Sequence, residues 1–181
     1  MKIKFSKLTS KDLRKVMKWR MLPEVKRYMF SEPNLTYYKQ KKWFKKIKND
    51  KSKKYWIVKV NDRDIGLVSL TNIDYKNKKA ERGYYIGETL QRGKGLGKQI
   101  EINLNDYVFI QMKFNKLFGY IFKFNKRMIS IHNKFGSKIE GELKRHILKN
   151  NKYEDIIIMS VFKNDWIYIR KKYFKVKAII E

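Results

Sequence analysis

The chain contains no cysteine, two prolines and two histidines among its 181 residues. The absence of cysteine excludes a disulfide framework and a thiolate-bound metal, and it is compatible with a reducing compartment. The two histidines, His132 and His146, are too few for a histidine-based zinc site without help from carboxylates. We therefore expect no bound metal.

Long hydrophobic segments are also missing. The N-terminal residues Met1–Ser6 alternate charged and apolar side chains, which is unlike the apolar stretch of a signal peptide. The densest apolar run, Ile156–Met159, has the length of a strand and is too short to span a membrane. These absences predict a soluble, cytoplasmic protein.

Acidic side chains are scarce, because 45 Lys and Arg stand against 17 Asp and Glu, for a formal net charge of +28. The hydrophobic fraction of 43% and the aromatic fraction of 15% are those of a folded domain, not of a disordered polycation. Lysine far outnumbers arginine, and the excess is spread along the chain, whereas nucleic-acid binders usually concentrate arginine on one face. The charge favours a solvated surface that attracts anionic small ligands, and weak non-specific binding of polyanions remains open.

Hydrophobic periodicity divides the chain into alternating short strands and helices. Ser10 is expected to cap a helix that ends near Met21, and Thr36 a second helix that ends near Lys48. A long helix is expected after the glycines at 93–97 and another over 126–135. Strands are expected at 2–8, 55–60, 65–73, 80–86, 117–122, 137–148 and 156–162. This order predicts an α/β protein with a mixed sheet between helices, as one domain over 1–166 followed by a basic, aromatic tail over 167–181.

A glycine-rich loop, Arg92-Gly-Lys-Gly-Leu-Gly97, lies directly between a predicted strand and the long helix. Glycine lets backbone N–H groups approach a ligand closely, and a helix N-terminus carries partial positive charge, so the segment suits a pyrophosphate. The glycine spacing fits neither the dinucleotide-binding fingerprint nor a P-loop. The alternative is a glycine-rich turn that binds nothing.

The loop and the segments around it resemble the GNAT superfamily of N-acetyltransferases over nearly the whole chain. The loop follows Gly83–Ile86, as the coenzyme A loop does in that family, and Asn125, Ile129 and Lys134–Gly136 match the segment after it. Gly141–Arg145, Tyr153–Asp155 and Met159 are similar to its C-terminal part. The resemblance implies a central, mostly antiparallel mixed sheet of about seven strands that splays after the fourth, and acetyl-CoA as cosubstrate.

The resemblance also implies which residues bind acetyl-CoA. Backbone groups of Tyr85, Ile86 and Gly87 would hold the pantetheine arm, and Asn125 would lie beside it near the sulfur. The pyrophosphate would rest on the main chain of Arg92, Gly93, Lys94, Gly95, Leu96, Gly97 and Lys98. Read from the residues alone, the first segment is an ordinary sheet strand and Asn125 an ordinary helix cap.

Two further residues are candidate catalysts. Much of the family protonates the leaving thiolate with a tyrosine at a position where this chain has His132, and an imidazolium can supply that proton. Glu81 stands where many relatives keep a carboxylate that acts as a base through water. The alternatives are a packing role for His132 and a strand carboxylate paired with Arg82 or a lysine for Glu81.

The segments around Trp19-Arg20, Tyr28–Phe30, Trp43 and Asn72–Asp74 look like the branch that acetylates a UDP-linked 4-amino-4,6-dideoxy sugar in pseudaminic-acid synthesis. That branch implies direct transfer in a ternary complex and acceptor contacts from Arg20, Met29, Phe30, Trp43 and Tyr85. Without the resemblance, the same residues predict a small hydrophobic core.

Other functions stay open at this point. A ribosomal-protein type of N-terminal acetyltransferase would use a basic surface to dock on RNA, and a GNAT-fold module could bind RNA without turnover. A polycation such as spermidine would be repelled by a chain of this charge. A homodimer formed through the final strands would suit the fold.

Overall fold

The computed structural model describes residues 3–174 and 179–180. Backbone contacts divide the chain into two compact units. The first unit consists of Met1–Ile73, Arg82–Leu96 and Ile179–Glu181, and the second of Asp74–Glu81 and Gly97–Ala178.

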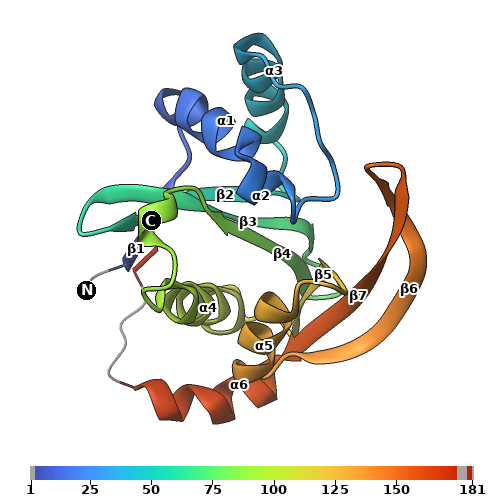
Figure 1. Ribbon diagram of the computed structural model, residues 1–181. Helices are drawn as coiled ribbons and strands as arrows, with labels where there is room; N and C mark the ends of the chain where they lie inside the picture. The colour runs from blue at the N-terminus through green and yellow to red at the C-terminus, as the bar shows by residue number, and fades with distance from the viewer. Residues whose placement is uncertain (1–2, 175–178, 181) are drawn as a thin grey trace. The chain divides into compact units, whose positions relative to one another are not determined.

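Seven strands are hydrogen-bonded in the order β1-β2-β3-β4-β5-β7-β6. Among the described residues the parallel pair is β4 with β5, whose register runs from Lys79 opposite Lys116 to Glu81 opposite Phe118. This mixed, mostly antiparallel sheet with flanking helices confirms the predicted fold class (Figure 1). The strand bounds are β1 Ile3–Lys7, β2 Lys54–Val60, β3 Arg63–Asp74, β4 Lys79–Ile86, β5 Lys116–Phe122, β6 Lys138–Lys149 and β7 Lys152–Phe162.

In the first unit, helices pack on the sheet through large apolar side chains. Helix α1 (Leu13–Met21) buries Val16 and Trp19, and α3 (Tyr37–Lys48) buries Ile47, in one cluster with Ile57 of β2 and Leu67 of β3. Figure 1 shows α1 and α3 lying side by side. The predicted C-terminal ends of both helices, Met21 and Lys48, match the structure, but the cap expected at Ser10 is wrong: Thr9 caps a 3-10 turn at Ser10–Asp12, and α1 begins at Leu13.

Local side-chain bonds fix where α3 begins and how the chain turns after it. Thr36 is the N-cap, as predicted, and its hydroxyl accepts the N–H of Lys39 at 3.3 Å. After the helix, the Asp50 carboxylate accepts the backbone N–H of Ser52 at 2.9 Å and pairs with the ammonium of Lys53 at 2.6 Å. These bonds hold the turn that leads into β2.

One helix of the first unit was not predicted. The stretch between the two prolines was expected to be irregular, but Pro23–Lys26 forms the short helix α2, and Val25 is buried. Proline is well suited to the first helical position because its missing N–H has no helical partner there. Short 3-10 turns stand at Ser10–Asp12 (η1) and Thr89–Gln91 (η2).

The main helix of the second unit is α4, which spans Leu96–Asp106 and continues as a π-helical turn at Tyr107–Gln111 (η3). Its first residue, Leu96, is counted with the first unit. Ile100, Ile102 and Leu104 are fully buried. The polar residues between them, Glu101 and Asn103, are buried as well. Every residue of α4 from Ile100 to Asp106 is therefore buried, although this part of the sequence is not uniformly apolar.

Helix α5 (Lys126–Lys134) packs through Met128 and Ile129 on Ile121 of β5 and on Ile157 and Met159 of β7. Strands β6 and β7 form the long curved hairpin of Figure 1. Its turn, at residues 150–151, uses two asparagines with φ of 49° and 57°, which suits a tight two-residue hairpin. Strand β7 accordingly begins at residue 152, four residues before the predicted start.

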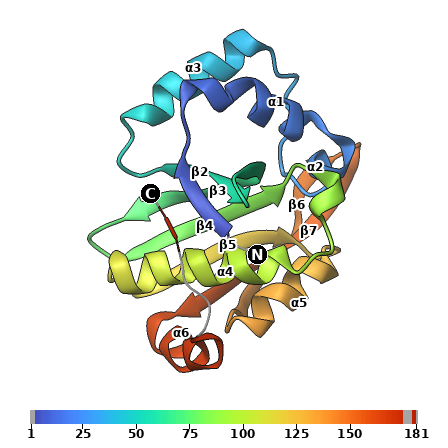
Figure 2. The same cartoon turned by 90° about the vertical axis from the view of Figure 1, so that its left-hand side faces the viewer.

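Helix α6 (Lys163–Arg170) is tied to α4 by a buried carboxylate (Figure 2 shows α6 below α4). Asp106 accepts the indole N–H of Trp166 at 3.0 Å and the Nε–H of Arg170 at 2.9 Å. The 3-10 turn η4 (Lys171–Tyr173) comes next. The boundary expected between residues 166 and 167 falls inside α6, and residues 175–178 and 181 of the expected tail lie outside the described residues.

The last described residues return to the first unit. The backbone N–H of Phe5 donates to the carbonyl of Ile179 at 2.9 Å, and Phe5 forms a parallel bridge with Ile180. No helix within residues 3–174 and 179–180 is long and apolar enough to cross a membrane.

Candidate active site

Two glycines of the predicted loop adopt a conformation that other residues rarely take. Gly93 and Gly95 have φ of 83° and 74°, and no atom lies within 4 Å of where a Cβ would stand at either position. Their glycine character is therefore set by backbone conformation and not by packing. The loop leads straight into the first turn of α4, so its amides and the helix N-terminus together suit an anionic group such as a pyrophosphate.

The basic side chains of the loop have different partners. The Arg92 guanidinium donates through Nε at 3.1 Å and Nη2 at 2.8 Å to the carbonyl of Ile86, which fastens the loop to the end of β4. Lys94 donates to Gln91 at 3.4 Å and is exposed. In the second unit, the Lys98 ammonium lies 4.8 Å from the centre of the Tyr173 ring. Of the two basic side chains in the loop, Arg92 is bound to Ile86 and Lys94 is exposed to solvent.

The end of β4 is packed closely against its neighbours in the first unit. A Cβ on Gly87 would stand 2.1 Å from the Trp19 ring, and the Gly87 N–H donates to the carbonyl of Ile65 at 2.8 Å. The indole N–H of Trp19 donates to the Glu88 carboxylate at 2.8 Å. The backbone N–H of Gly87 and the carbonyl of Ile86, two groups expected to face a pantetheine arm, therefore already have partners inside the protein.

Arg20 and Tyr85, two of the predicted acceptor residues, come together in the first unit. Arg20 donates through Nη2 to the carbonyl and hydroxyl of Ser31, at 2.5 and 3.1 Å. Its other terminal nitrogen, Nη1, and the Tyr85 hydroxyl are buried without a hydrogen-bond partner in the described chain. Burial lowers the pKa of Arg20, against the opposing effects of Tyr85 and Glu32, and burial raises the pKa of Tyr85. Each of the two residues therefore keeps a buried donor that no hydrogen bond of the described chain satisfies.

The other predicted acceptor residues divide between packing and surface. The Trp43 and Tyr55 rings pack edge to face, with their centroids 5.1 Å apart, within the apolar cluster of α1 and α3. Met29 is half-buried and Phe30 is exposed, immediately before Ser31. Sequence reasoning missed Tyr55 and Ser31, because their roles depend on contacts that no local pattern indicates.

In the second unit, Asn125 and His132 lie at the two ends of α5. Asn125 is the N-cap, and its side-chain oxygen accepts the N–H of Met128 at 3.3 Å. His132 is only 4% exposed, and its Nδ1 lies 2.9 Å from Oε1 of Glu101, which is fully buried on α4. Glu101 was missed because an acidic helix residue is usually exposed to solvent. His146 is exposed on β6.

Glu81 ends the parallel register of β4 with β5 and is half-buried opposite Phe118. Its neighbour Arg82 is buried. The described part of the chain holds no group of three or more His, Asp and Glu residues that could hold a metal ion.

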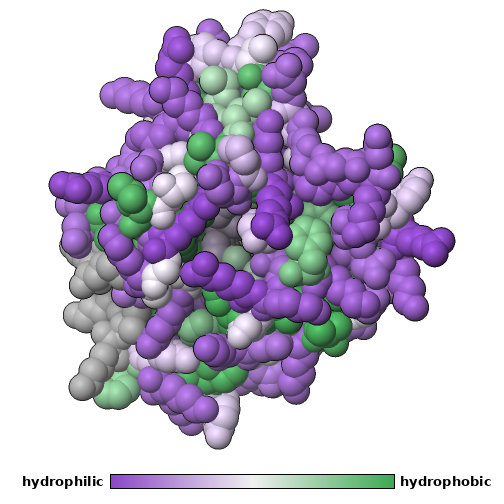
Figure 3. All heavy atoms as spheres, in the orientation of Figure 1, coloured by the Kyte–Doolittle hydropathy of each residue, from purple (hydrophilic) through white to green (hydrophobic). Residues whose placement is uncertain are grey.

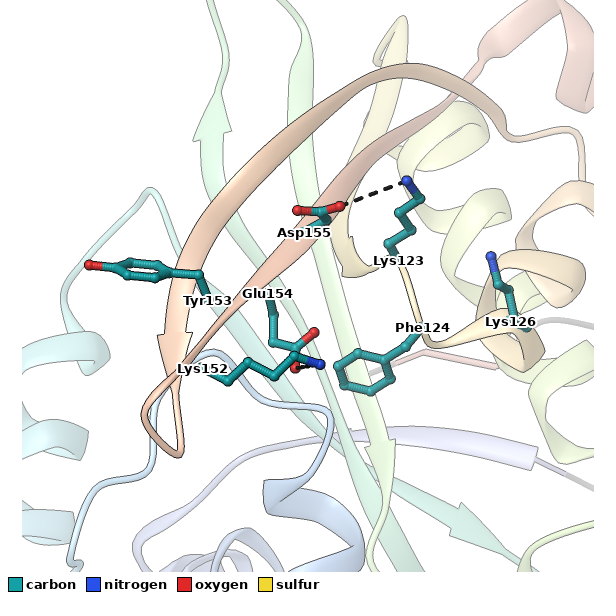
Figure 4. A pocket seen from close by; sticks show the side chains of 7 residues that line it. All are labelled: Lys123, Phe124, Lys126, Lys152, Tyr153, Glu154 and Asp155. Carbon is teal, nitrogen blue, oxygen red and sulfur yellow. Dashed lines mark ion pairs between the residues drawn. The ribbon is translucent and has the colours of Figure 1, made fainter.

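A shallow hollow of about 350 Å³ lies between the start of α5 and the β6–β7 hairpin (Figure 4). Lys123 pairs with Asp155 at 3.7 Å, and Lys152 pairs with Glu154 at 3.4 Å. Tyr153 points away from the other side chains in the figure. The hollow is lined by Lys123, Phe124, Lys126, Lys152, Tyr153, Glu154 and Asp155. Because its carboxylates are paired with lysines, it offers little to a cationic ligand, and no sequence pattern predicted it.

Comparisons with known proteins agree on one family. Residues 2–138 match the model of the acetyltransferase (GNAT) domain. The chain is 30% identical over 165 residues to the spermidine N(1)-acetyltransferase of Escherichia coli K12, covering 91% of this chain and 88% of that protein. It is 29% identical to the acetyltransferase PseH of Campylobacter jejuni (strain 81-176), covering 71% and 78% of the two chains. The solved spermidine N-acetyltransferase of Vibrio cholerae, in complex with CoA and spermine, superposes with a TM-score of 0.86 at 22% identity over 91% of this chain and 98% of that one.

Proposed function

This chain belongs to the GNAT acetyltransferase family and is an acetyl-CoA-dependent N-acetyltransferase, and from that membership we propose that its acceptor is the amine of an anionic, nucleotide-linked amino sugar. The proposed sugar is a UDP-linked 4-amino-4,6-dideoxy sugar. The observation that carries the proposal is the pair of Arg20 and Tyr85, two half-buried residues that each have one buried polar atom without a hydrogen-bond partner in the described chain.

An unpaired guanidinium nitrogen in a buried place is costly, and a phosphate or carboxylate oxygen would offset that cost. Arg20 is half-buried, and one of its terminal nitrogens is already fixed by Ser31, so the direction of the free one is set before any ligand arrives. The Tyr85 hydroxyl can donate to the same group, and burial keeps it protonated because its pKa is raised. A positively charged amine could accept no hydrogen bond from either donor.

The surrounding charge supports the same class of acceptor. Residues 10–50, which include α1, α2 and α3, carry 13 basic and four acidic side chains. Helix α3 has six lysines and no acidic residue. Hydrophilic side chains also cover most of the face seen in Figure 3. A basic surface attracts a nucleoside diphosphate and repels a polyamine.

In the proposed mechanism, acetyl-CoA supplies the acetyl group as an activated thioester. The amides of Gly93, Gly95 and the first turn of α4 would bind its pyrophosphate, and Lys94 would add a positive charge at the same loop. Asn125 and the remaining backbone groups of Tyr85, Ile86 and Gly87 are proposed to contact the pantetheine arm, because the Ile86 carbonyl and the Gly87 N–H are bonded within the protein. Alignment of the two reactants can lower the barrier by about 7–11 kcal/mol.

The neutral acceptor amine attacks the acetyl carbonyl directly, the carbon–sulfur bond breaks, and the sulfur leaves as a thiolate. A backbone N–H of β4 would polarise the carbonyl. His132 is proposed to give a proton to the departing thiolate. Glu81 is proposed to act as the base, taking the proton of the amine by way of a bridging water molecule. These residues lie on elements on both sides of the glycine loop in the sequence.

A polyamine acceptor is the second candidate, favoured by the 30% identity to a spermidine N(1)-acetyltransferase across most of the chain. The basic segment 10–50 argues against it. Acetylation of a protein N-terminus at the ribosome, and binding of RNA without turnover, are further alternatives that the same assay separates. The proposal also includes a cytoplasmic location and a homodimer, the second testable by mass measurement in solution.

The experiment compares thiol release from acetyl-CoA with four acceptors: a UDP-linked 4-amino-dideoxy sugar, spermidine, a ribosomal-protein N-terminal peptide and water alone. We expect rapid release with the sugar nucleotide. Turnover with spermidine alone would overturn the anionic acceptor. Turnover with the peptide alone, together with salt-dependent sedimentation with ribosomes, would support the N-terminal acetyltransferase instead.

The matched variants are Arg20→Gln and Lys18→Gln, which remove the same charge from α1. Lys18 is exposed, so it controls for the general loss of charge. Because a hydrogen bond to a charged group contributes about 1.5–3 kcal/mol, Arg20→Gln should raise the KM for the sugar nucleotide about 10–160-fold and leave the KM for acetyl-CoA unchanged. Equal effects of the two variants would show that Arg20 has no specific contact with the acceptor.

A further inference from the structure

Helix α3 has an apolar side that packs on the first unit and a basic side that faces solvent. Trp43, Phe44 and Ile47 belong to the apolar cluster that α3 shares with α1 and the sheet. With about 3.6 residues per turn, the lysines of the helix all fall on the opposite half of its surface. Tyr38 lies among them and is 71% exposed. The lysines, each of them exposed, are Lys39, Lys41, Lys42, Lys45, Lys46 and Lys48.

The charge on this side is not neutralised within the described chain. Neither α1 nor α3 contains an acidic residue. Lys39 donates to the backbone carbonyl of Asn34 at 3.1 Å, which leaves its charge in place. Within residues 3–174 and 179–180, the lysines of α3 that have no acidic partner include Lys42, Lys45, Lys46 and Lys48. Neighbouring like charges repel each other, so an anion that binds between them relieves that repulsion.

The basic side of α3 continues onto α1 through Tyr37. The Arg14 guanidinium of α1 lies 4.2 Å from the centre of the Tyr37 ring, and the Lys41 ammonium lies 5.5 Å from the same centre. Arg14 is exposed. We call Arg14, Tyr38 and the six lysines of α3 the basic face. It belongs entirely to the first unit.

The length of the basic face favours a repeating anion over a single diphosphate. The helix rises about 14 Å between Lys39 and Lys48. A sugar nucleotide has two phosphates and can meet only part of a row of this length. Lysine is a point charge on a flexible stem and lacks the fork with which arginine recognises one group in two places. The face is therefore suited to a chain of phosphates whose base sequence it does not read.

Two features favour a single strand of nucleic acid over an anionic membrane surface. The large apolar side chains of α3 at positions 43, 44 and 47 are turned toward the protein, so the helix has no apolar side to insert among lipids. The exposed ring of Tyr38 lies among cations, which is the arrangement on which an unpaired base stacks while its phosphates meet the charges.

We propose that the basic face binds single-stranded nucleic acid without sequence preference, through contacts of its lysines with phosphates and stacking of a base on Tyr38. This interaction accompanies acetyl transfer and does not replace it. It does not depend on which amine accepts the acetyl group, so the proposed acceptor and the basic face are tested separately.

The experiment measures the fluorescence anisotropy of a labelled oligouridylate, about 20 nucleotides long, as the full chain is added at several salt concentrations. We expect a Kd of about 10⁻⁴–10⁻⁶ M at physiological salt. With about three or four phosphate contacts, the slope of log K against log salt should be about −2 to −3. No binding at low salt would overturn the proposal.

The double variant Lys42→Gln with Lys45→Gln removes two charges from the middle of the basic face. The matched control is Lys76→Gln with Lys79→Gln, which removes two exposed lysines of the second unit. The first variant should weaken binding about 10–30-fold at about 0.1 M salt and make the slope shallower by about 1.4, whereas the control should change neither. Equal effects of the two double variants would overturn the assignment to α3.

Tyr38 provides a readout that loss of charge does not move. Tyr38→Ala should weaken binding about 5-fold or more and leave the salt slope unchanged, and Tyr38→Phe should bind like the original chain. Equally tight binding of a duplex of the same length would overturn the preference for a single strand. Binding to phosphatidylglycerol vesicles without binding to the oligouridylate would assign the face to a membrane instead.

The binding measurement contains neither acetyl-CoA nor an acceptor. Thiol release on the sugar nucleotide without oligouridylate binding would therefore overturn the role of the basic face and leave the proposed function intact. Oligouridylate binding without thiol release from any acceptor would have the opposite meaning. Thermal unfolding of each variant shows whether a loss of binding comes from a loss of fold.

Discussion

Replacing Gly95 by alanine should impair the loop through backbone conformation alone. Gly95 has a φ of 74°, and nothing lies within 4 Å of the Cβ that alanine would add. The substitution therefore creates no clash inside the protein. What it adds is the cost of holding an L-residue in the left-handed region, about 1–2 kcal/mol.

This cost is divided between folding and binding. If the variant loop keeps its conformation, the protein loses about 1–2 kcal/mol of stability, which corresponds to a fall in Tm of about 2–8 °C for a chain of this size. If the loop relaxes, the cost appears when acetyl-CoA restores the conformation, as an increase in Kd of about 5–30-fold. The two losses together should come to about 1–2 kcal/mol.

The assay combines isothermal titration with acetyl-CoA and thermal unfolding of the free protein. Gly93→Ala, at a φ of 83°, should behave like Gly95→Ala. Gly141→Ala is the control, because Gly141 also has open space around it but no positive φ. Unchanged Kd and unchanged Tm in both loop variants would refute the reasoning, because the loop would then not need the left-handed conformation.

Three further predictions concern stability and titration. Asp106→Asn should destabilise the protein by about 3–5 kcal/mol, because it removes the charge at a buried ion pair and weakens the bond to Trp166. Urea unfolding followed by tryptophan fluorescence measures this loss, and a loss below about 1 kcal/mol would contradict the prediction. Gly87→Ala should cost at least about 1–3 kcal/mol in the same experiment, because the new Cβ would overlap the Trp19 ring. In an NMR titration, Asp50 should show a pKa of about 2, lowered by its hydrogen bonds. Since the folded state then binds that proton less tightly than the unfolded state, its contribution to stability is present above about pH 4 and is lost as the pH falls toward 2.

The parts of the fold that depend on local chemistry could be predicted from the sequence. Thr36 caps α3 as expected, and the turn after β2 uses Asn61 and Asp62 with φ of 47° and 63°, as a tight hairpin requires. Side chains that bond within three residues of their own position leave a signal in the sequence. The strand pattern and the fold class came from the same kind of signal.

The parts that were missed depend on contacts distant in the sequence. Helix α2 and the early start of β7 stand where prolines and charged residues predicted loops, and packing of Val25 and closure of the β6–β7 turn decide them instead. The π-helical turn at the end of α4 has no sequence signal that periodicity can detect.

The candidate site shows the same division. The glycine loop was predicted because glycine spacing before a helix is a local pattern, and two of its glycines do have positive φ values, while its role as a binding site stays a prediction. The hydrogen bond from Arg20 to Ser31 and the ion pair of Glu101 with His132 were not found. In each case the partner lies on another element, and nothing in either segment alone indicates which side chain it meets.

Strand β1 is the first strand in the strand order, so one of its backbone edges has no neighbouring strand. Residues 179 and 180 bond to Phe5 and cover part of that edge. An uncovered sheet edge is a template for pairing with another molecule. Removing the last three residues should therefore change the behaviour of this protein in concentrated solution before it changes its activity. We expect such a shortened chain to self-associate through β1, because Ile179 and Ile180 no longer cover Phe5.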